Sequence, residues 1–380
     1  MRVLVAPDKF KGTLTAAEAA AHVAAGLREA GHRAVELPIA DGGEGTLEAA
    51  LAAGFRRLPV TVSGPTGKPV DAAIGLRDGT AVVELALASG LTLAPRDPLG
   101  ASSRGTGELI RAALDAGARR IVLGLGGSAS TDGGAGLLSA LGARILDGAG
   151  REVPAGGGAL AWAESADLGG LDPRLADVEM VLACDVDNPL LGPDGAAEVY
   201  GPQKGADPEA VALLDAALER FAVVIARTGA ERSLSERFAP VPLISPSVSA
   251  APGAGAAGGV GFAALAVLGA RRRAGIEVVL ELVGFAEALD GADLVVTGEG
   301  ALDRQTLHGK GPAGVAAAAR AAGVPVVAVC GRCDLDPAGL AGAGFARVDA
   351  LADLDPVRCT TDPGPLLRQV GRGLGIPEAG

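Results

Sequence analysis

The chain has 380 residues, a length that favours two or more domains. It carries 33 Lys and Arg against 45 Asp and Glu, and a net charge of −12 repels phosphate backbones, so we expect no nucleic-acid partner. No apolar run approaches the roughly 18 residues that a membrane span needs, and the apolar stretch at Met1–Asp8 is too short for a signal peptide. We therefore expect a cytoplasmic protein without a membrane partner.

Short apolar runs of strand character alternate with Ala-rich amphipathic stretches, which is typical of parallel α/β architecture. The predicted buried strands are residues 3–6, 35–39, 121–125, 180–183, 294–297, 326–329 and 347–350. The predicted helices are residues 15–30, 107–116, 208–227, 259–274 and 312–322. Thr15 and Glu18 have the spacing of a capping box at the start of the first helix.

Residues 60–95 break this alternation, because they show antiparallel strand patterns joined by Gly/Pro and Asp-Gly turns. If the first two and last three strands share one sheet, the chain leaves that sheet near residue 60 and returns near 285. The sequence thus predicts an α/β fold with two domains. Residues 1–60 and 285–380 form a discontinuous flavodoxin- or Rossmann-like parallel-sheet domain, and residues 61–284 form an inserted α/β domain. Ligands of such folds bind at the carboxyl ends of strands and between domains, so we expect the active site in the cleft between the two domains.

Clusters of Gly with Asp, Glu, Ser or Lys follow most of these strands, where a doubly wound sheet presents its functional loops. The clusters are residues 6–15, 41–46, 124–136, 185–189 and 298–311, and a further Gly-rich segment, 253–261, lies between helices. This placement is the main indication of an enzyme in the residues themselves.

The clusters supply the parts that phosphoryl transfer requires: phosphate cradles, carboxylates for Mg²⁺, and cationic side chains. The segments 124–136 and 253–261 suit phosphate binding, although tight helix packing also explains the glycines. Asp185 and Asp187 suit Mg²⁺, and an Asx turn is the alternative. The absence of a Walker or protein-kinase loop excludes the P-loop mechanism.

Lysine is rare, because only five of the 33 basic residues are Lys. They are Lys9, Lys11, Lys68, Lys204 and Lys310. All but Lys68, which lies in a predicted hairpin turn, fall in Gly-rich or Asp-rich segments. Such a bias indicates that Lys is kept where a compact ammonium is needed, and random placement is the alternative.

Five blocks of sequence resemble one known family. They are residues 6–14, 41–46, 126–136, 184–190 and 297–306, beginning with Ala-Pro-Asp-Lys-Phe-Lys-Gly-Thr-Leu. In this order they are similar to the bacterial glycerate kinase family, of the type-1, glycerate 2-kinase-like class, over roughly residues 1–375. The resemblance implies ATP- and Mg²⁺-dependent phosphorylation of D-glycerate, with the 2-hydroxyl favoured. The family commonly has Ser where this chain has Lys9, so the resemblance favours Lys11 as the catalytic cation.

The resemblance also suggests roles for individual residues, which we state as hypotheses. The catalytic candidates are Lys11, Asp41, Asp187 and Lys310; the two lysines would neutralise charge, and either aspartate could be the general base. The substrate-binding candidates are Asp8, Glu44, Ser128 and Arg304, and Arg304 could hold the glycerate carboxylate in a bidentate fork. The ATP-binding candidates are Gly255, Gly258, Gly259, Glu299 and Asp303. The Mg²⁺ candidates are Asp185 and Asp187.

Other functions stay open at this point. The enzyme could phosphorylate another small hydroxy acid, and a non-catalytic nucleotide- or small-acid-binding protein could use the same loops. An NAD-dependent oxidoreductase is disfavoured because no G-x-G-x-x-G follows the first strand. The expected partners are D-glycerate and ATP, and the sequence predicts no oligomeric state.

Overall fold

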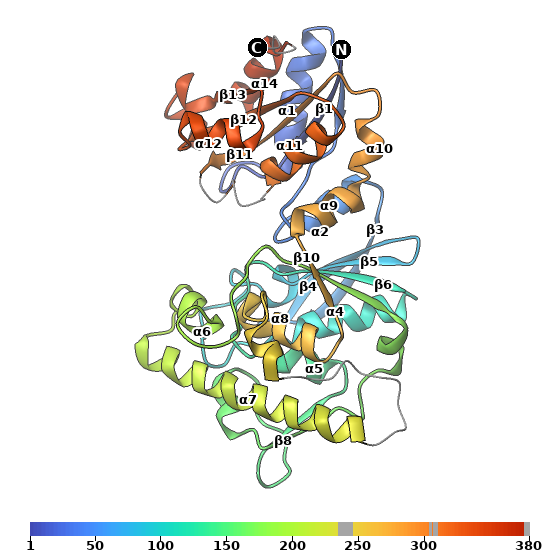
Figure 1. Cartoon of the computed structure of the whole chain (residues 1–380), viewed down its shortest axis with the longest axis vertical. Coiled ribbons are helices and arrows are strands. Elements are labelled where there is room, and N and C mark those ends of the chain that lie inside the picture. Colours follow the sequence, from blue (N-terminus) through green and yellow to red (C-terminus); the bar gives the residue numbers. More distant parts are fainter. Residues whose placement is uncertain (235–245, 304–305, 307–310, 376–380) are drawn as a thin grey trace. The chain divides into compact units, whose positions relative to one another are not determined.

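The structure is a computed structural model that describes residues 1–234, 246–303, 306 and 311–375. Contacts divide the chain into two compact units, residues 1–55 with 274–380 and residues 56–273 (Figure 1). The chain enters the second unit at β3 (Arg56–Ser63) and leaves it just before α9 (Gly275–Val283). The second crossing precedes the expected residue 285 because α9 places Ile276 and Val279 in the core of the first unit.

The first unit is built on a parallel sheet of five strands. Their spatial order is β2 (Arg33–Glu36), β1 (Arg2–Pro7), β11 (Leu294–Leu302), β12 (Val326–Cys333) and β13 (Arg347–Ala350). Counted along the chain, this is the order 2-1-3-4-5 of flavodoxin-like folds. The α/β fold class predicted from the sequence is confirmed. The order reverses between β1 and β11, and the carboxyl ends of such a strand pair are the usual ligand position.

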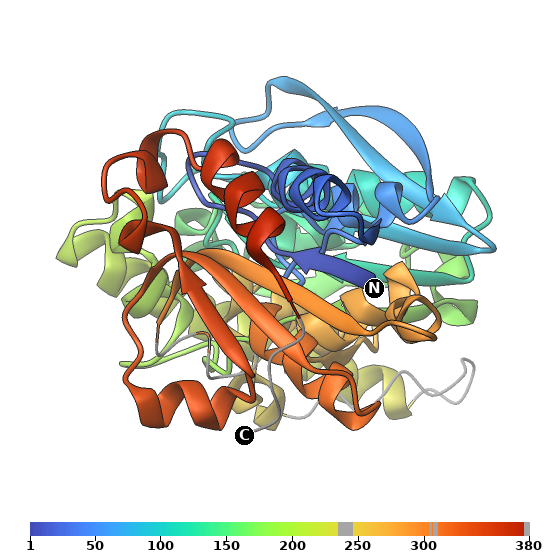
Figure 2. The same cartoon turned by 90° about the horizontal axis from the view of Figure 1, so that it is seen from above.

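Helices cover both faces of this sheet. On one face, α1 (Ala16–Glu29) and α14 (Gly364–Gly373) pack side by side (Figure 2). They can approach closely because Gly26 has no Cβ atom. A Cβ built at this position would lie 2.1 Å from the carbonyl oxygen of Arg368. The apolar core of the other face includes residues of α2 (Thr46–Ala52), α9, α10 (Phe285–Leu289) and α11 (Gly311–Ala321). The shorter elements of this unit are α12 (Pro337–Ala343), η6 (Leu351–Asp353) and α13 (Arg358–Thr361).

The capping box predicted for the first helix is confirmed. The Oγ1 atom of Thr15 accepts a hydrogen bond of 3.2 Å from the backbone N–H of Glu18, and the Glu18 carboxylate accepts one of 2.8 Å from the Thr15 backbone. This box fixes the turn between β1 and α1, and therefore the loop that carries Asp8 to Thr13.

The second unit contains a mixed sheet of six strands. Their order is β10 (Arg271–Arg273), β9 (Glu179–Ala183), β6 (Arg120–Gly124), β5 (Thr80–Glu84), β4 (Pro69–Arg77) and β3. The strands β3, β4 and β5 are antiparallel, as the sequence predicts, and the Asp78-Gly79 turn joins the last two. From β5 to β10 the pairs are parallel, so their carboxyl ends share one edge.

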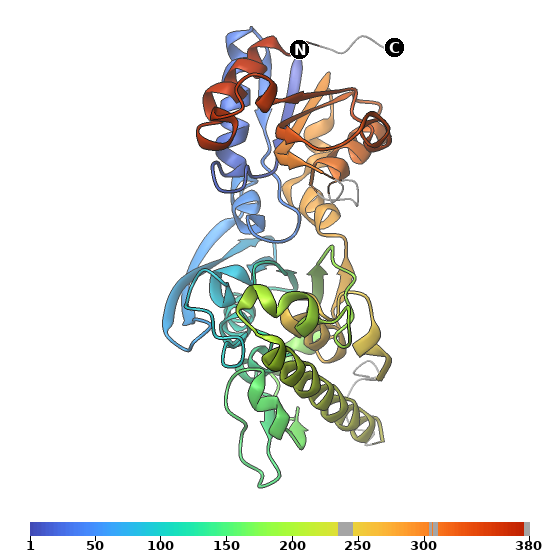
Figure 3. The same cartoon turned by 90° about the vertical axis from the view of Figure 1, so that its left-hand side faces the viewer.

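The helix predicted over residues 259–274 is found, but its predicted C-terminal end is wrong. The observed helix α8 (Ala256–Ala266) stops earlier, because Arg271–Arg273 pair with β9 as a strand. The other elements of this unit are α3 (Ala86–Ser89), α4 (Arg104–Asp115), α5 (Ala135–Ala140), β7 (Arg144–Leu146), η1 (Gly158–Trp162), β8 (Ser165–Asp167), η2 (Pro173–Asp177), α6 (Ala196–Tyr200), η3 (Pro202–Lys204), α7 (Pro208–Leu234) and η4 (Pro246–Ala250). The long helix α7 runs beside η1 and β8 (Figure 3). Among the described helices, none is both long and apolar enough to cross a membrane.

Candidate functional site

Two carboxylates lie where the strand order of the first unit reverses. Asp8 directly follows β1, and its backbone N–H donates a 2.8 Å hydrogen bond to the carbonyl of Gly298 on β11. The next residue of β11 is Glu299, whose carboxylate accepts a 2.7 Å hydrogen bond from Oγ1 of Thr306. Parallel pairing thus places Asp8, just beyond the end of β1, beside Glu299, in the second half of β11. Only 6% of Asp8 is exposed.

Burial changes the protonation of both groups. Desolvation raises the pKa of Asp8 to about 6; Asp41 adds to this rise and Lys9 opposes it. Desolvation also raises the pKa of Glu299 to about 7, while the hydrogen bond from Thr306 opposes the rise and the charges of Asp8, Asp303 and Asp41 add to it. Both carboxyl groups can therefore exchange protons near neutral pH, which is typical of functional sites.

Lys9 lies among these acidic groups. Its Nζ atom is 3.7 Å from Oδ1 of Asp8 and 4.0 Å from Oδ1 of Asp41, and it donates a 2.9 Å hydrogen bond to the carbonyl of Glu44. Glu44 and Lys11 are both exposed residues. Within the described part of the chain, Lys9 thus contacts three predicted site residues, Asp8, Asp41 and Glu44. A cavity of about 160 Å³ opens beside Asp8 and Lys9 and extends to Thr15 and Glu48.

In the second unit, Asp185 and Asp187 follow β9. Asp187 is exposed, and its Oδ1 atom lies 2.5 Å from Nη2 of Arg272. Asp185 is half-buried. The described residues contain no group of three or more His, Cys, Asp or Glu that could hold a metal ion. A cation bound by these two aspartates would therefore need water or phosphate oxygens to complete its coordination.

The Gly-rich start of α8 packs against the loops that follow β6 and β9. Residues Ala257, Gly258 and Gly259 have φ values of 52°, 68° and 91°, in the left-handed region. A Cβ on Gly258 would lie 2.0 Å from the carbonyl oxygen of Ser130, and one on Gly255 would lie 2.1 Å from that of Pro189. Close packing accounts for these glycines by itself, so phosphate binding by this segment stays a prediction.

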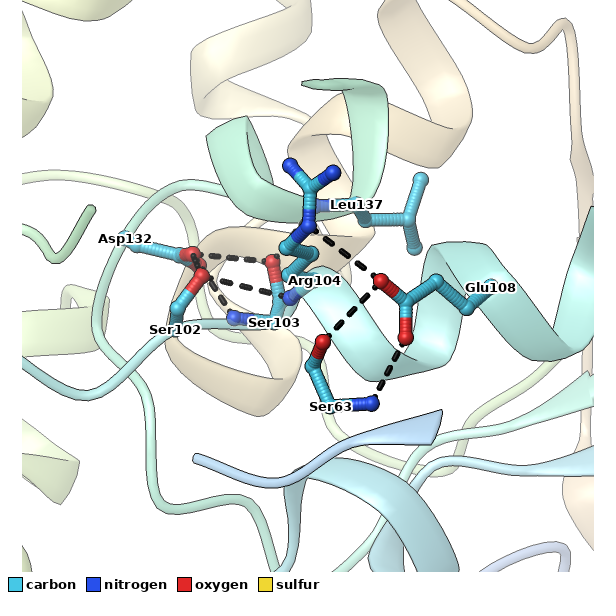
Figure 4. A network of polar contacts seen from close by, with 7 residues as sticks. All are labelled: Ser63, Ser102, Ser103, Arg104, Glu108, Asp132 and Leu137. Atoms are coloured by element: carbon cyan, nitrogen blue, oxygen red, sulfur yellow. Dashed lines mark hydrogen bonds and ion pairs between the residues drawn. The ribbon is translucent and has the colours of Figure 1, made fainter. Parts of the chain in front are cut away.

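Asp132 anchors the loop after β6 (Figure 4). It is fully buried, and its Oδ2 atom accepts hydrogen bonds from the backbone N–H of Ser103 at 2.8 Å and from Oγ of Ser103 at 2.9 Å. The backbone N–H groups of Gly134 and Gly136 also donate to its carboxylate, at 3.1 and 3.2 Å. The acid in this block thus joins the loop to the start of α4, which is a structural role.

Lys204 is buried behind the same loop. Its Nζ atom donates to Oγ of Ser128 at 2.9 Å, to the carbonyl of Ser130 at 2.5 Å and to Oγ1 of Thr131 at 3.4 Å. Burial lowers the pKa of Lys204 to about 7, and the charge of Asp132 opposes this shift. The scarcity of Lys drew attention to this residue, but no sequence pattern indicated its role.

The structure groups the candidates by unit. In the first, Glu299 lies close enough to three other acidic candidates for their charges to raise its pKa; these are Asp8, Asp41 and Asp303. In the second, Ser128 accepts a hydrogen bond from Lys204, whose Nζ atom lies close to Gly258. The candidates Arg304 and Lys310 lie outside the described residues. Sequence reasoning assigned no role to Thr306, although this residue ends the block 297–306; its contact with Glu299 appears only in the structure.

Parallel strands followed by carboxylates and Gly-rich loops are typical of α/β proteins that bind small ligands at the strand ends. Comparison with known proteins agrees, since residues 3–369 match the model of the glycerate kinase family. The chain is 46% identical to a glycerate kinase of Bacillus subtilis (strain 168), over 94% of this chain and 91% of that one. It is 45% identical to a glycerate 2-kinase of Escherichia coli (strain K12), over 87% of this chain and 85% of that one.

A crystal structure of a candidate glycerate kinase 2 from Salmonella typhimurium LT2 has the same fold, with a TM-score of 0.82 and 42% identity over 98% of each chain. The chain therefore belongs to the glycerate kinase family, whose members are phosphotransferases. The family resemblance noted in the sequence is confirmed.

Proposed function

We propose that this protein transfers the γ-phosphoryl group of ATP to D-glycerate, with the 2-hydroxyl as the favoured acceptor. Family membership supports the reaction, and the relative named glycerate 2-kinase supports the position. The observation that carries the proposal is the pair of carboxyl groups of Asp8, which is buried and directly follows β1, and Glu299, which is half-buried on the adjacent strand β11; the pKa of each is raised toward neutrality.

The reaction needs a group that accepts one proton. As the hydroxyl oxygen of glycerate forms its bond to the γ-phosphorus, the bond from that phosphorus to the β,γ-bridging oxygen breaks and ADP leaves. The hydroxyl proton passes to a general base, which works best when its pKa is near the operating pH. We assign this role to Asp8, because it is buried, lies at a strand end and has a pKa near 6.

The two bases suggested by the sequence are the alternatives. Asp41 lies in the same acidic group and is 4.0 Å from Lys9, so it stays a candidate. Asp187 is less suited, because its carboxylate is exposed and paired with Arg272. We further propose that Lys11 and Lys310 neutralise phosphate or carboxylate charge, that Glu44 and Arg304 bind glycerate, and that the Gly255–Gly259 segment binds ATP.

Magnesium is proposed to bind Asp185 and Asp187. Two carboxylates at one strand exit fit this ion, because Mg²⁺ in phosphoryl-transfer sites takes one or two carboxylates together with phosphate oxygens and water. When bound, the ion supplies positive charge to the phosphates. Asp187 would exchange its contact with Arg272 for this role. Glu299 and Asp303 are the other available carboxylates.

An ADP-release assay across a panel of acids tests the substrate. The panel contains D-glycerate, L-glycerate and tartronate, each with ATP and with or without Mg²⁺. We expect release with D-glycerate that depends on Mg²⁺ and exceeds release with the other acids at least about tenfold. Greater activity with tartronate would instead indicate a kinase for another hydroxy acid.

Replacement of each acid by its amide identifies the base. We expect Asp8→Asn to lower kcat by about 10²- to 10⁴-fold, the usual contribution of a general base. Asp41→Asn is the matched comparison within the same acidic group. A larger loss in Asp41→Asn than in Asp8→Asn would transfer the role to Asp41.

A further inference from the structure

In its charged form, the amino group of Lys204 has an acceptor for each of its three protons. Two are hydroxyl oxygens, of Ser128 and Thr131, and the third is the carbonyl oxygen of Ser130. Only 1% of Lys204 is exposed. All three acceptors belong to the loop that follows β6, so Lys204 joins η3 to one short segment of that loop.

Burial of an ammonium costs several kcal/mol unless it is well hydrogen-bonded, and an apolar side chain of similar length would fill the same volume without that cost. The charge of Lys204 is therefore hard to explain by packing alone. It does not face a ligand either, because its protons are directed at the loop. The remaining explanation for a lysine at this position is its effect on the groups that it contacts.

That consequence falls on Ser128. Its Oγ atom accepts the hydrogen bond from Lys204, so its own proton points in another direction, and no described residue accepts that proton. A hydroxyl that accepts from an ammonium is polarised and becomes a stronger donor. Ser128 retains 6% exposure, whereas Lys204 behind it is almost completely covered.

A second hydroxyl at this position also lacks a partner. The Oγ atom of Ser130 is buried and has no hydrogen-bond partner among the described residues. Buried polar atoms are normally satisfied, and an exception calls for an explanation such as a ligand, an ion or water. The loop therefore carries two hydroxyl groups, on Ser128 and Ser130, that can still donate.

We propose that Lys204 is a positioning residue, which holds residues 128–131 and directs the Ser128 hydroxyl as a donor to an anionic oxygen of the bound substrate. The oxygen belongs either to the carboxylate of the hydroxy acid or to a phosphate of the nucleotide. The identity of these ligands rests on the proposed function. The start of α8 also packs closely against Lys204, since a Cβ on Gly258 would lie 2.8 Å from Nζ of Lys204.

A double-mutant cycle tests this coupling. KM and kcat are measured for Lys204→Met, Ser128→Ala and the double variant, with glycerate and with ATP varied in turn. We expect each single variant to raise the KM of the same substrate by at least about fivefold, and the double variant to be little worse than either, because both changes remove one interaction. A rise in KM for glycerate identifies the carboxylate, and a rise for ATP identifies the phosphate.

Two controls separate this role from folding. Lys68→Met makes the same change in the turn between β3 and β4, and we expect wild-type KM and kcat. Lys204→Arg keeps the charge, but the wide guanidinium does not fit three acceptors placed around one nitrogen, so we expect no rescue. Melting temperatures identify variants that lose stability alone. If Lys204→Met does not fold, the KM values of Ser128→Ala decide the question.

Additive effects, or wild-type KM values in Ser128→Ala, would overturn the inference. Calorimetric titration with ADP, and separately with D-glycerate, keeps it testable if the wild-type protein shows no kinase activity. In that case the proposed function fails, while weaker binding of either ligand to both single variants would still support the role of Lys204. Equal binding of both ligands by wild type and both variants would reject it.

Discussion

The ammonium group of Lys9 lies 3.7 Å from Oδ1 of Asp8, the carboxylate that follows the first strand. The backbone N–H of Lys9 donates to the same oxygen at 2.6 Å. Burial raises the pKa of Asp8, and both contacts with Lys9 oppose this rise because they stabilise the charged carboxylate. Lys9 therefore sets how far the pKa of Asp8 rises, although the family resemblance had favoured Lys11.

Replacement of Lys9 tests this relationship. In Lys9→Met the pKa of Asp8 should rise further, because burial and Asp41 then act without the opposing charge. If Asp8 is the base, the acidic limb of the kcat/KM profile moves to higher pH, which a series of assays from pH 5 to pH 9 will detect. Lys68→Met, in the hairpin turn, should leave the limb in place. An unmoved limb in Lys9→Met would contradict the role of either Lys9 or Asp8.

Glu299 should make stability depend on pH. Its pKa is about 7 in the folded protein, above the ordinary value of 4.5, so between these values the folded chain binds more protons than the unfolded chain. The free energy of unfolding then falls as pH rises through about 7, and the contribution is complete only below about 4.5. In Glu299→Gln we expect a smaller decrease in the free energy of unfolding between pH 5 and pH 8. Urea titrations at both pH values measure the free energy of unfolding. Equal decreases in the wild type and in Glu299→Gln would contradict the raised pKa of Glu299.

Gly258 should be more sensitive to substitution than a glycine of similar φ without close neighbours. Gly258→Ala places Cβ 2.0 Å from the carbonyl of Ser130 at a φ of 68°. Gly117 has a φ of 80° and nothing within 4 Å, so Gly117→Ala carries the backbone cost alone, about 1–2 kcal/mol. We expect Gly258→Ala to cost a further 1–3 kcal/mol or so from overpacking. Equal losses in denaturant titrations would show that the contact relaxes freely.

Asp187 should affect the requirement for magnesium. We expect Asp187→Asn to lower turnover by orders of magnitude, to leave the melting temperature near that of wild type, and to raise the Mg²⁺ concentration for half-maximal rate at least about tenfold. Glu198→Gln, an exposed change on α6, is the control. Wild-type turnover in Asp187→Asn would remove this residue from the site.

The sequence predicted the architecture well because strand signals are local. The runs Val3–Ala6 and Leu294–Val296 are apolar throughout, as is typical of strands buried on both faces, and they lie at the centre of the first sheet. The strand at Arg271–Arg273 was missed, because three arginines carry no strand signal and only pairing with β9 makes them one. For the same reason the predicted helix of this region extended too far.

The site was harder to predict, since motifs identify loops but not partners. Asp8 and Glu299 stand in clusters that the sequence marks, yet their protonation depends on burial that only the fold supplies. Asp132 lies in a motif typical of a ligand loop, and the structure shows that its carboxylate holds the loop together. Lys204 is about 75 residues from the loop it contacts, so no local pattern could reveal the pairing.

Phosphorus NMR of the reaction mixture directly tests whether the protein transfers a phosphoryl group from ATP to the 2-hydroxyl of D-glycerate. The purified protein is incubated with ATP, Mg²⁺ and D-glycerate, and the products are compared with authentic 2- and 3-phosphoglycerate. We expect ADP and 2-phosphoglycerate in equal amounts. Formation of 3-phosphoglycerate would contradict the assigned position, and unchanged ATP and glycerate would contradict the proposed reaction itself.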